Sequence, residues 1–483
     1  MLRSLLLSAL CFALLHTPSF SQPQIQTREV VTGLWVPWEL VWGPDDFLWI
    51  TERPGMVSRV NPETGERRII LNIRHRVAET NEGGMLGMKL HPNMVDTPQV
   101  FIVHTFWNEN DVLVRLVRYD YDAALDSLVN ETILVDSIPG GLFHDGSQIA
   151  ISDDRKIYMT TGEGGIQPRA QSHLTLAGKT LRMNMDGSTP EDNPWAAAPW
   201  PLSLIWTTGH RNPQGLAFGP DGTLYSSEHG QDDNDELNII RRGRNYGWPY
   251  ANGYCSDTLG AWPGIDKQQF CLDSNVAEPI MAWTPTVAPA SLVYYSHTAI
   301  PQWHNSLLLT TLGRLKPELP PDSYSLLQIT LSNDGQSIVK DTAYFRLQYG
   351  RLRGICVSPD GRVFISTSNQ DGRAATEHGF PRAGDDRIIE ISAPVGSNVP
   401  MKQQHAEFTV IPMPTIGDAR ITFARKFGRG TVKLFGKAGR TLRSEEFSGG
   451  NEYHFHRGDL GPGTYFLRIN DGRHSLECPI VVQ

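Results

Sequence analysis

The chain has 483 residues and a net charge of −9, from 43 Lys and Arg against 52 Asp and Glu. Residues 401–483 are basic, with 12 Lys and Arg against 8 Asp and Glu, so the preceding 400 residues hold the acidic excess. An acidic body disfavours nucleic-acid binding, which needs a basic face, and favours neutral ligands or cations.

The N-terminal stretch MLRSLLLSALCFALLHTPSFS has the pattern of a secretory signal peptide. Arg3 precedes an apolar run from Leu5 to Leu15, which is too short to span a bilayer. No later stretch is apolar over the roughly eighteen residues that a transmembrane helix needs. We therefore expect residues 1–21 to be removed, and the mature chain from Gln22 to be secreted or held at the cell surface.

Four cysteines remain once Cys11 leaves with the signal, and their spacing matches no zinc or haem motif. Cys255 and Cys271 flank a stretch rich in Gly, Pro and Asp. Because an exported protein meets oxidising conditions, these two residues are a candidate disulfide.

A turn of the Pro-Asp or Asp-Asp kind, followed by a β-rich run, recurs six times. The copies are GPDDFLWITE (43–52), HPNMVDTPQVFIVH (91–104), SDDRKIYMTTGE (152–163), GPDGTLYSSE (219–228), WHNSLLLTTL (303–312) and SPDGRVFISTS (358–368). Apolar residues alternate within several copies, as Val363 and Ile365 do, which predicts strands with one buried face. Six such units predict an all-β fold, a six-bladed β-propeller over residues 22–393. A two-sheet sandwich is the alternative, but it predicts shorter and more even turn spacing.

Beyond the propeller, residues 394–406 are polar and aperiodic, which is typical of a linker. The runs ARITFA, GTVKLFGKAG, NEYHFH and GTYFLRI follow, separated by Gly-rich turns. They predict a small antiparallel β-sandwich over residues 407–483.

Two polar clusters lie in the first half of the predicted propeller. Glu82 stands beside two glycines in NEGGMLGMKLHP, where backbone can approach a ligand closely, although a plain turn explains it equally. His144 precedes one predicted strand and Glu163 ends the next, so antiparallel pairing brings them to one mouth. A histidine with a carboxylate behind it is a positioned general base. A histidine with a purely structural role is the alternative.

Three arginines and an asparagine form the next candidates. In GHRNPQG (209–215), Pro213 fixes its own φ and keeps Asn212 out of the helical region, so Arg211 and Asn212 sit on stiff backbone. Such rigid presentation suits a planar anionic ligand. Arg351 and Arg353 are two residues apart, so on a strand both point to one face. Loop capping or surface ion pairing is the alternative for each.

An acidic loop follows EHG and contains Asp232, Asp233, Asp235 and Glu236. Oxygen-rich loops of this kind bind calcium, with main-chain carbonyls completing the shell. A solvated acidic turn is the alternative interpretation.

Together these clusters resemble one family over residues 30–392. The chain resembles the soluble glucose/sorbosone dehydrogenases in a series of motifs. They are GHRNPQG, EHG, DELN and NYGWP, followed in order by WTPTVAPAS, RLRG-x-x-VSPDG and TSNQDGR with DDRIIEI. These aldose sugar dehydrogenases use pyrroloquinoline quinone (PQQ) on a six-bladed propeller. The resemblance implies oxidation of an aldose to a lactone by hydride transfer to a calcium-bound quinone. Because no fused cytochrome is visible, it also implies a separate electron acceptor.

The resemblance also implies roles for individual residues. His144 would be the base for the anomeric hydroxyl, Glu163 would orient it, and Glu82 and Gln214 would line the sugar pocket. Guanidinium forks match carboxylates bidentately, and the quinone carries three of them. The implied cofactor clamp consists of Arg211, Asn212, Arg351, Arg353 and Arg314.

Two calcium sites are implied in the same way. The main-chain carbonyls of Gly230 and Gln231 would hold an ion that touches the quinone and polarises its carbonyl. Glu236 and the Tyr246 carbonyl resemble a second, structural site.

The sequence departs from the family at several of these positions. The family commonly has Asp where Glu163 stands and Gln where Glu82 stands, and its glucose-active branch has an acidic residue in place of Phe143. These departures leave the preferred sugar open. For the family's cofactor lysine, TTLGRLKPELP offers Arg314 or Lys316, and Arg314 is the interpretation adopted.

Residues 407–483 resemble the C-terminal sorting domains of the type IX secretion system. GTVKLFGKAGRTL, LGPGTYFLRINDG and the closing PIVVQ carry the likeness, whereas IPMPT departs from the usual Pro-Asn-Pro opening. The resemblance implies recognition by the type IX machinery and passage across an outer membrane.

Two other functions fit a propeller of this kind. One is a non-catalytic binding module, as in hedgehog-interacting proteins, and the other is a calcium-dependent lactonase. A binder need not keep an anion clamp, and lactone hydrolysis has no use for three arginines at one mouth. The presence of the arginines together with His144 therefore favours the dehydrogenase.

Overall fold

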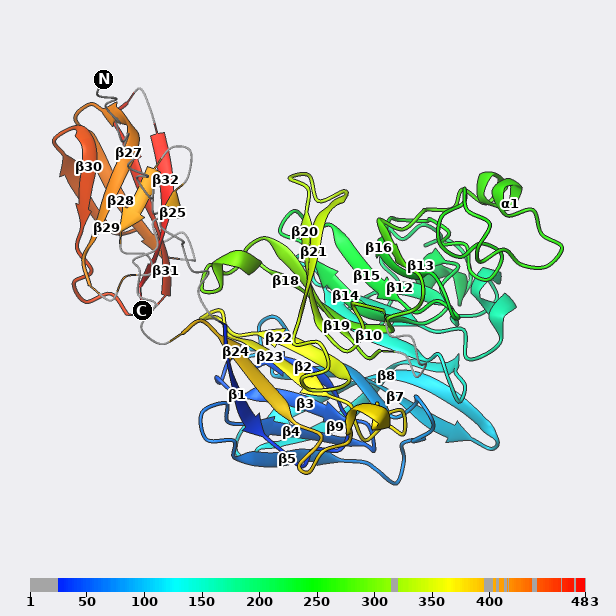
Figure 1. The fold of residues 1–483 in the computed structure, drawn as a ribbon. Helices are drawn as coiled ribbons and strands as arrows, with labels where there is room; N and C mark the ends of the chain where they lie inside the picture. The colour runs from blue at the N-terminus through cyan, green and yellow to red at the C-terminus, as the bar shows by residue number, and fades with distance from the viewer. Residues whose placement is uncertain are drawn as a thin grey trace, which may run out of the picture. The chain divides into compact units, whose positions relative to one another are not determined.

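The computed structural model describes residues 25–313, 320–394, 403–404, 408–411, 415, 417–436, 441–461, 463–472 and 475–482. The predicted signal peptide, Arg314 and Lys316 lie outside these described residues. The chain divides into two compact units, Met1–Ala393 and Pro394–Gln483, both visible in Figure 1. Each unit is built from β-strands.

The described part of the first unit forms six four-stranded antiparallel sheets. From the inner to the outer strand, the first three sheets are β2 (Pro37–Trp42), β3 (Leu48–Glu52), β4 (Met56–Val60) and β5 (Arg67–Asn72); β6 (Met85–Leu90), β7 (Gln99–Asn108), β8 (Asp111–Asp122) and β9 (Ser127–Pro139); and β10 (Gly146–Ile151), β11 (Lys156–Thr161), β12 (Lys179–Asn184) and β13 (Ile205–Thr208).

The other three sheets follow the same plan, and the N-terminal strand completes the last one. They are β14 (Pro213–Phe218), β15 (Leu224–Glu228), β16 (Asp235–Ile239) and β17 (Met281–Trp283); β18 (Pro289–Tyr295), β19 (Ser306–Thr311), β20 (Leu326–Leu331) and β21 (Ile338–Tyr344); and β22 (Leu352–Val357), β23 (Val363–Thr367), β24 (Ile388–Ser392) and β1 (Gln26–Val31). Pairing of β1 with β24 joins the two ends of the unit.

The inner strands contact one another in a closed ring, in the order β2, β6, β10, β14, β18 and β22. This ring of sheets is the predicted β-propeller, with one sheet per blade, and the all-β prediction is confirmed. The six sequence repeats supply the second strands of the blades, β3, β7, β11, β15, β19 and β23. Because each inner strand pairs antiparallel with its second strand, the start of one and the end of the other meet at the same mouth.

The second strands are buried on both faces, which corrects the prediction of one buried face. Val363, Phe364 and Ile365 of β23 are all buried, and so are Ile157, Tyr158 and Met159 of β11. Each blade packs between two neighbours, so both of its faces are interior. Strands in such a position are apolar on both sides rather than alternating.

Helices are few and lie in the loops of the first unit. The described helices are α1 (Lys267–Asp273) and the 3₁₀ turns η1 (Gln167–Gln171), η2 (Leu202–Leu204), η3 (Pro301–Trp303) and η4 (Thr376–His378). Asp266 caps α1 by accepting a hydrogen bond from the Gln269 amide. Cys271 of α1 is bonded to Cys255, so the candidate disulfide is present. Within the described ranges, no helix has the length and apolar character needed to cross a membrane.

The second unit contains two four-stranded sheets, as the sequence predicted for a sandwich. They are β25 (Gln403–Gln404), β26 (Phe408–Ile411), β27 (Ala419–Phe427) and β30 (Gly450–Phe455), and β29 (Thr441–Phe447), β28 (Gly430–Gly436), β31 (Gly463–Asn470) and β32 (Ser475–Val482). The core between them includes Ile421, Phe423, Val432 and Leu467. Strand β25 falls in the range predicted as a linker.

Candidate active site

One mouth of the propeller holds a cavity of about 280 Å³. Its walls come from the segments where inner strands begin and second strands end. The lining residues are Glu82, Phe143, His144, Arg211, Gln214, His229, Gly230, Gln231, Thr286, Ala288, Leu312, Gly313, Arg351, Arg353 and Arg373. Most of the described residues singled out in the sequence therefore meet in one place.

His144 and Glu163 form a hydrogen-bonded pair at this cavity. His144 lies two residues before β10, and Glu163 lies two residues after β11. The distance from His144 Nδ1 to Glu163 Oε1 is 2.7 Å. The His144 side chain is 20% exposed, whereas that of Glu163 is fully buried. The Glu163 amide also donates to the Arg211 carbonyl, which fixes the carboxylate behind the imidazole. His144 thus presents its other ring nitrogen to the cavity with its orientation set from behind.

Glu82 stabilises the backbone that carries His144. Its Oε2 accepts a hydrogen bond from the His144 amide at 2.9 Å, and its Oε1 accepts one from Arg373 Nη1 at 2.6 Å. His144 has a φ of 63°, in the left-handed region that non-glycine residues rarely adopt. Burial alone would raise the pKa of Glu82, but Arg373 and His144 outweigh it and lower the pKa to about 2. Glu82 is therefore an ionised contact of His144 as well as part of the cavity wall.

Asp145, the residue after His144, is a buried carboxyl that sequence reasoning missed. Its Oδ1 accepts a hydrogen bond from the Gly141 amide at 3.0 Å, and its Oδ2 has no hydrogen-bond partner among the described residues. Burial raises the pKa of Asp145 to about 7, and the charges of Glu82 and Glu163 act in the same direction. Nothing in the local sequence indicates this burial, because the neighbouring residues are glycine and histidine.

Arg211 lines the cavity, whereas its neighbour Asn212 lies behind it. Arg211 Nη1 donates to the His229 carbonyl at 3.4 Å, and its guanidinium lies 5.3 Å from the Trp248 ring centre. Asn212 is fully buried, and its Oδ1 accepts a hydrogen bond from the Gly146 amide at 3.1 Å. Asn212 therefore holds neighbouring backbone and does not line the cavity.

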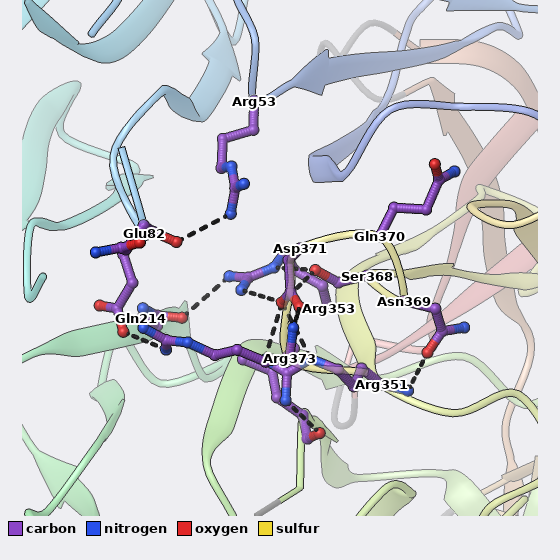
Figure 2. Close-up of polar contacts among 12 residues, drawn as sticks. Arg53, Glu82, Gln214, Arg351, Arg353, Ser368, Asn369, Gln370, Asp371 and Arg373 are labelled. Atoms are coloured by element: carbon purple, nitrogen blue, oxygen red, sulfur yellow. Dashed lines mark hydrogen bonds and ion pairs between the residues drawn. The ribbon is translucent and has the colours of Figure 1, made fainter. Parts of the chain in front are cut away.

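Arg351, just before β22, and Arg353 within it point to the same side, as their spacing predicted, and converge on Asp371 (Figure 2). Arg351 donates from Nε and Nη2 to Asp371 Oδ2 at 3.0 and 2.9 Å. Arg353 Nη1 donates to Gln214 Oε1 at 3.1 Å, which places Gln214 beside the guanidinium. Burial lowers the pKa of Arg353 to about 10. Both guanidinium groups are thus buried cations at the floor of the cavity.

Arg373 and Phe143 form the rim. The Arg373 guanidinium lies 5.4 Å from the Phe143 ring centre and bridges to Glu82. Arg53, in the upper part of Figure 2, lies nearby. Its Nη1 donates to the Asn81 carbonyl at 3.2 Å. The rim is therefore partly aromatic.

Gly230 and Gln231 of the acidic loop line the cavity, whereas the acidic residues of the loop do not. Asp235 is buried and accepts hydrogen bonds from the amides of Gly230, Val287 and Ala288. A side chain on Gly230 would lie 2.0 Å from the Asp233 carbonyl, so only glycine fits this close approach. No group of three or more His, Cys, Asp or Glu suited to a metal occurs in the part of the chain that the structure describes. A cation here would rely on carbonyl oxygens such as those of Gly230 and Gln231.

Glu236 and Tyr246 lie away from this cavity. Glu236 faces Glu228 across the β15–β16 pair, and its Oε1 accepts a hydrogen bond from the Gly253 amide at 2.6 Å. Burial and the Glu228 carboxylate raise the pKa of Glu236 to about 8. The Tyr246 ring stacks on His210, which bonds to Glu228. The structure thus groups these residues around a buried carboxylate pair.

Sequence reasoning named no role for three residues of the site, Asp371, Arg373 and His229. Asp371 and Arg373 lie in TSNQDGR and His229 lies in EHG, so the motifs contained them. His229 Nε2 lies 2.8 Å from the Pro289 carbonyl oxygen, and burial lowers the pKa of His229 to about 3. Their partners come from distant segments, which no local pattern reveals.

Chemically, the cavity combines an oriented base with a set of buried cations. His144 can accept a proton from a bound hydroxyl, and Arg211, Arg351 and Arg353 can bind a planar anion with several carboxylates.

Comparison with known proteins finds relatives of this chain. The glucose/sorbosone dehydrogenase family model matches residues 34–376. The chain is similar to quinoprotein glucose dehydrogenase B of Acinetobacter calcoaceticus, with 30% identity over 73% of this chain and 87% of the relative. It is 25% identical to the aldose sugar dehydrogenase YliI of Escherichia coli, over 70% of this chain and 88% of the relative.

A solved structure extends the comparison to the fold. The PQQ-bound form of an aldose sugar dehydrogenase from Streptomyces coelicolor is 31% identical, with a TM-score of 0.62. The match covers 77% of this chain and 99% of that protein.

Proposed function

The chain belongs to the glucose/sorbosone dehydrogenase family of oxidoreductases, and we propose that it oxidises the anomeric carbon of an aldose to a lactone, with PQQ as its cofactor. The observation that carries the proposal is the meeting of the His144–Glu163 pair with three buried arginines in one cavity. A lactonase needs only the histidine–carboxylate pair, and a binding module needs neither feature. A quinone-dependent dehydrogenase needs both.

The donor set fits a planar tricarboxylate. Arg211, Arg351 and Arg353 would hold the carboxylates, because guanidinium forks bind carboxylates bidentately. The buried Arg211 Nε has no hydrogen-bond partner among the described residues, so a ligand oxygen there would satisfy it. When bound, the quinone supplies the acceptor for the hydride of the anomeric carbon.

The proton of the anomeric hydroxyl goes to His144 in this proposal. Its Nδ1 is engaged by Glu163 at 2.7 Å, so Nε2 is the atom that accepts the proton. The Glu163 carboxylate stabilises the imidazolium that forms. Glu82 keeps the backbone of His144 in place through the 2.9 Å bond to its amide. Gln214, beside Arg353, completes the wall on the sugar side.

Calcium fits the same wall on the chemistry of its ligands. Calcium prefers oxygen ligands, and the Gly230–Gln231 backbone lines the cavity next to the arginines. These carbonyls would hold the ion, which acts as a Lewis acid. Glu236, with the Tyr246 carbonyl, is proposed as the second calcium site.

The test combines binding and turnover. Purified chain is mixed with PQQ and calcium, and dye reduction is followed with a panel of aldoses. We expect the melting temperature to rise when PQQ and calcium are added, because a ligand at a hundredfold excess over its Kd stabilises the folded state by about 2.7 kcal/mol. A melting temperature that does not change when PQQ and calcium are added would favour a binding module. Lactone hydrolysis without dye reduction would favour a lactonase.

We also propose that the chain is exported through its N-terminal signal, and that the second unit directs passage across the outer membrane by the type IX machinery. The signal pattern of residues 1–21 and the tail motifs support this. The second unit has its own apolar core, so a chain ending at Ala393 keeps an intact propeller. Cell fractionation of both forms is the test. Appearance of the shortened chain outside the cell, at the level of the full chain, would refute the sorting role.

A further inference from the structure

We infer that Asp371 is a positioning residue that presets Arg351 and Arg353 as an anion-binding pair. The inference rests on the proposed function, in which this pair holds carboxylates of the quinone. Asp371 lies in the loop after β23, and its side chain is only 3% exposed. Neither its charge nor its burial is needed by the proton transfer assigned to His144.

Asp371 reaches both guanidinium groups from one carboxylate oxygen. Its Oδ2 accepts hydrogen bonds from Arg351 Nε and Nη2 at 3.0 and 2.9 Å. The same oxygen accepts a bond from Ser368 Oγ at 3.0 Å, and Ser368 Oγ in turn accepts one from Arg353 Nε at 3.1 Å. The Ser368 hydroxyl thus links the carboxylate to the second guanidinium (Figure 2).

The carboxylate is itself fixed, so it can act as a template. Its Oδ1 accepts a hydrogen bond from the main-chain amide of Arg373 at 2.9 Å. On their other sides, Arg351 donates to the Leu312 carbonyl at 3.0 Å and Arg353 donates to Gln214 at 3.1 Å. Each guanidinium is therefore held from two directions before a ligand arrives.

The charges explain why such a template is needed. Arg351 and Arg353 have side chains only 4% and 8% exposed, and two buried cations side by side repel each other. Burial acts to raise the pKa of Asp371, but the two arginines outweigh it and hold the pKa below its usual range. Asp371 therefore remains ionised and keeps both cations at the cavity floor. A preset site loses less conformational freedom when the ligand binds.

Two physical effects predict opposite results when this charge is removed. If Asp371 only competed with the ligand for the arginines, Asp371→Asn would strengthen binding of a polyanion. If it positions them, the same substitution weakens binding, although the site becomes more positive. The direction of the change in affinity therefore decides between them.

The experiment measures equilibrium binding of PQQ to the full chain in calcium, by absorbance or fluorescence titration and without substrate. We expect Asp371→Asn to raise the Kd for PQQ roughly ten- to a hundredfold. This is the loss in affinity expected when one or two hydrogen bonds to a charged group are removed. Asp371→Glu keeps the charge and should recover part of the affinity. It also carries the test if the Asn variant does not fold.

Asp136→Asn is the matched control. Arg115 donates from Nε to Asp136 Oδ1 at 3.1 Å and from Nη2 to Oδ2 at 3.2 Å. This is also a paired Arg–Asp contact, but it lies on an outer strand and its Asp136 side chain is 40% exposed. This variant should bind PQQ like the parent. An unchanged or lower Kd for Asp371→Asn would overturn the inference.

A second measurement separates this inference from the proposed function. Failure of the parent chain to bind PQQ would contradict the proposed function, not the positioning role. Phenylglyoxal modification of the cofactor-free chain, followed by mass spectrometry, then decides the role of Asp371. We expect Arg351 to react several-fold faster in Asp371→Asn, because its guanidinium loses two bonds. Equal rates of modification would refute the positioning role.

Discussion

Replacing His144 with alanine tests the assignment of the base. In the structure, the imidazole contributes one bond of 2.7 Å to Glu163 and one ring nitrogen that faces the cavity. Alanine removes both. The amide of residue 144 remains, so its bond to Glu82 is kept. The arginine pair with Asp371 lies on another blade and is untouched by the change.

The expected magnitudes follow from these contacts. A positioned general base contributes roughly 10²- to 10⁴-fold to turnover, which equals about 3–5 kcal/mol of transition-state stabilisation. Stability should fall as well, because Glu163 is left buried and loses its partner, at a cost of roughly 1–3 kcal/mol. Affinity for PQQ should stay close to that of the parent chain.

The assay is reduction of bound PQQ by an aldose in a single turnover, in parallel with a titration of PQQ affinity. Single-turnover kinetics separate the chemical step from cofactor binding and product release. The expected result is a large loss in the rate of reduction with little change in Kd.

His229 provides the internal comparison, since it lines the same cavity. Its Nε2 lies 2.8 Å from the Pro289 carbonyl oxygen rather than from a carboxylate, and burial lowers the pKa of His229 to about 3, so its ring is a poor proton acceptor near neutral pH. His229→Gln should therefore slow reduction far less than His144→Ala does. Reduction at the parent rate in His144→Ala, or a larger loss in His229→Gln, would refute the assignment.

Three further substitutions are expected to act through buried polar groups. Glu163→Gln keeps the shape of the side chain but removes the charge behind His144. Turnover should therefore fall roughly ten- to a hundredfold with little change in KM, because a hydrogen bond to a charged group contributes a free energy of that size. A loss as large as that of His144→Ala would contradict this. Asp145 has a pKa raised to about 7 by burial, so between its ordinary value and pH 7 the native state binds more protons than the unfolded state, and stability falls as pH rises. Asp145→Asn cannot ionise, and its gain in melting temperature over the parent should grow from pH 4 to 7 and then level off; a gain independent of pH would be inconsistent. Lys179 is fully buried and donates to three main-chain carbonyls at 2.7–2.9 Å, so Lys179→Met should lower the free energy of unfolding by roughly 2–5 kcal/mol in denaturant titrations. A loss below about 1 kcal/mol would show that water replaces the ammonium.

Much of the propeller could be predicted because its signals are local. Each repeat contains a turn and the strand that follows it. The six strands of the repeats are the second strands of the six blades. The pairing of His144 with Glu163 was also predictable, since they flank two strands that are consecutive in sequence. Arg351 and Arg353 were placed on one side by a spacing of two residues, which a strand converts into a shared face.

Burial on both faces of the blades could not be predicted in the same way. The alternation of Val363 and Ile365 suggested one buried face, yet Phe364 between them is equally buried. Whether the second face is covered depends on the neighbouring blade, which a pattern within one strand does not describe.

By itself, the sequence determined the strands, the mouth at which the polar residues gather, and the candidates for the base and for the arginines of the proposed cofactor site. Only the tertiary structure decided which carboxylates those residues contact. Glu82 meets Arg373 across 291 positions of the chain, and Asn212 turned toward Gly146 rather than into the cavity. Closing the ring of blades brings these distant segments together, and buried charges such as Arg373 and Glu82 then pair across them.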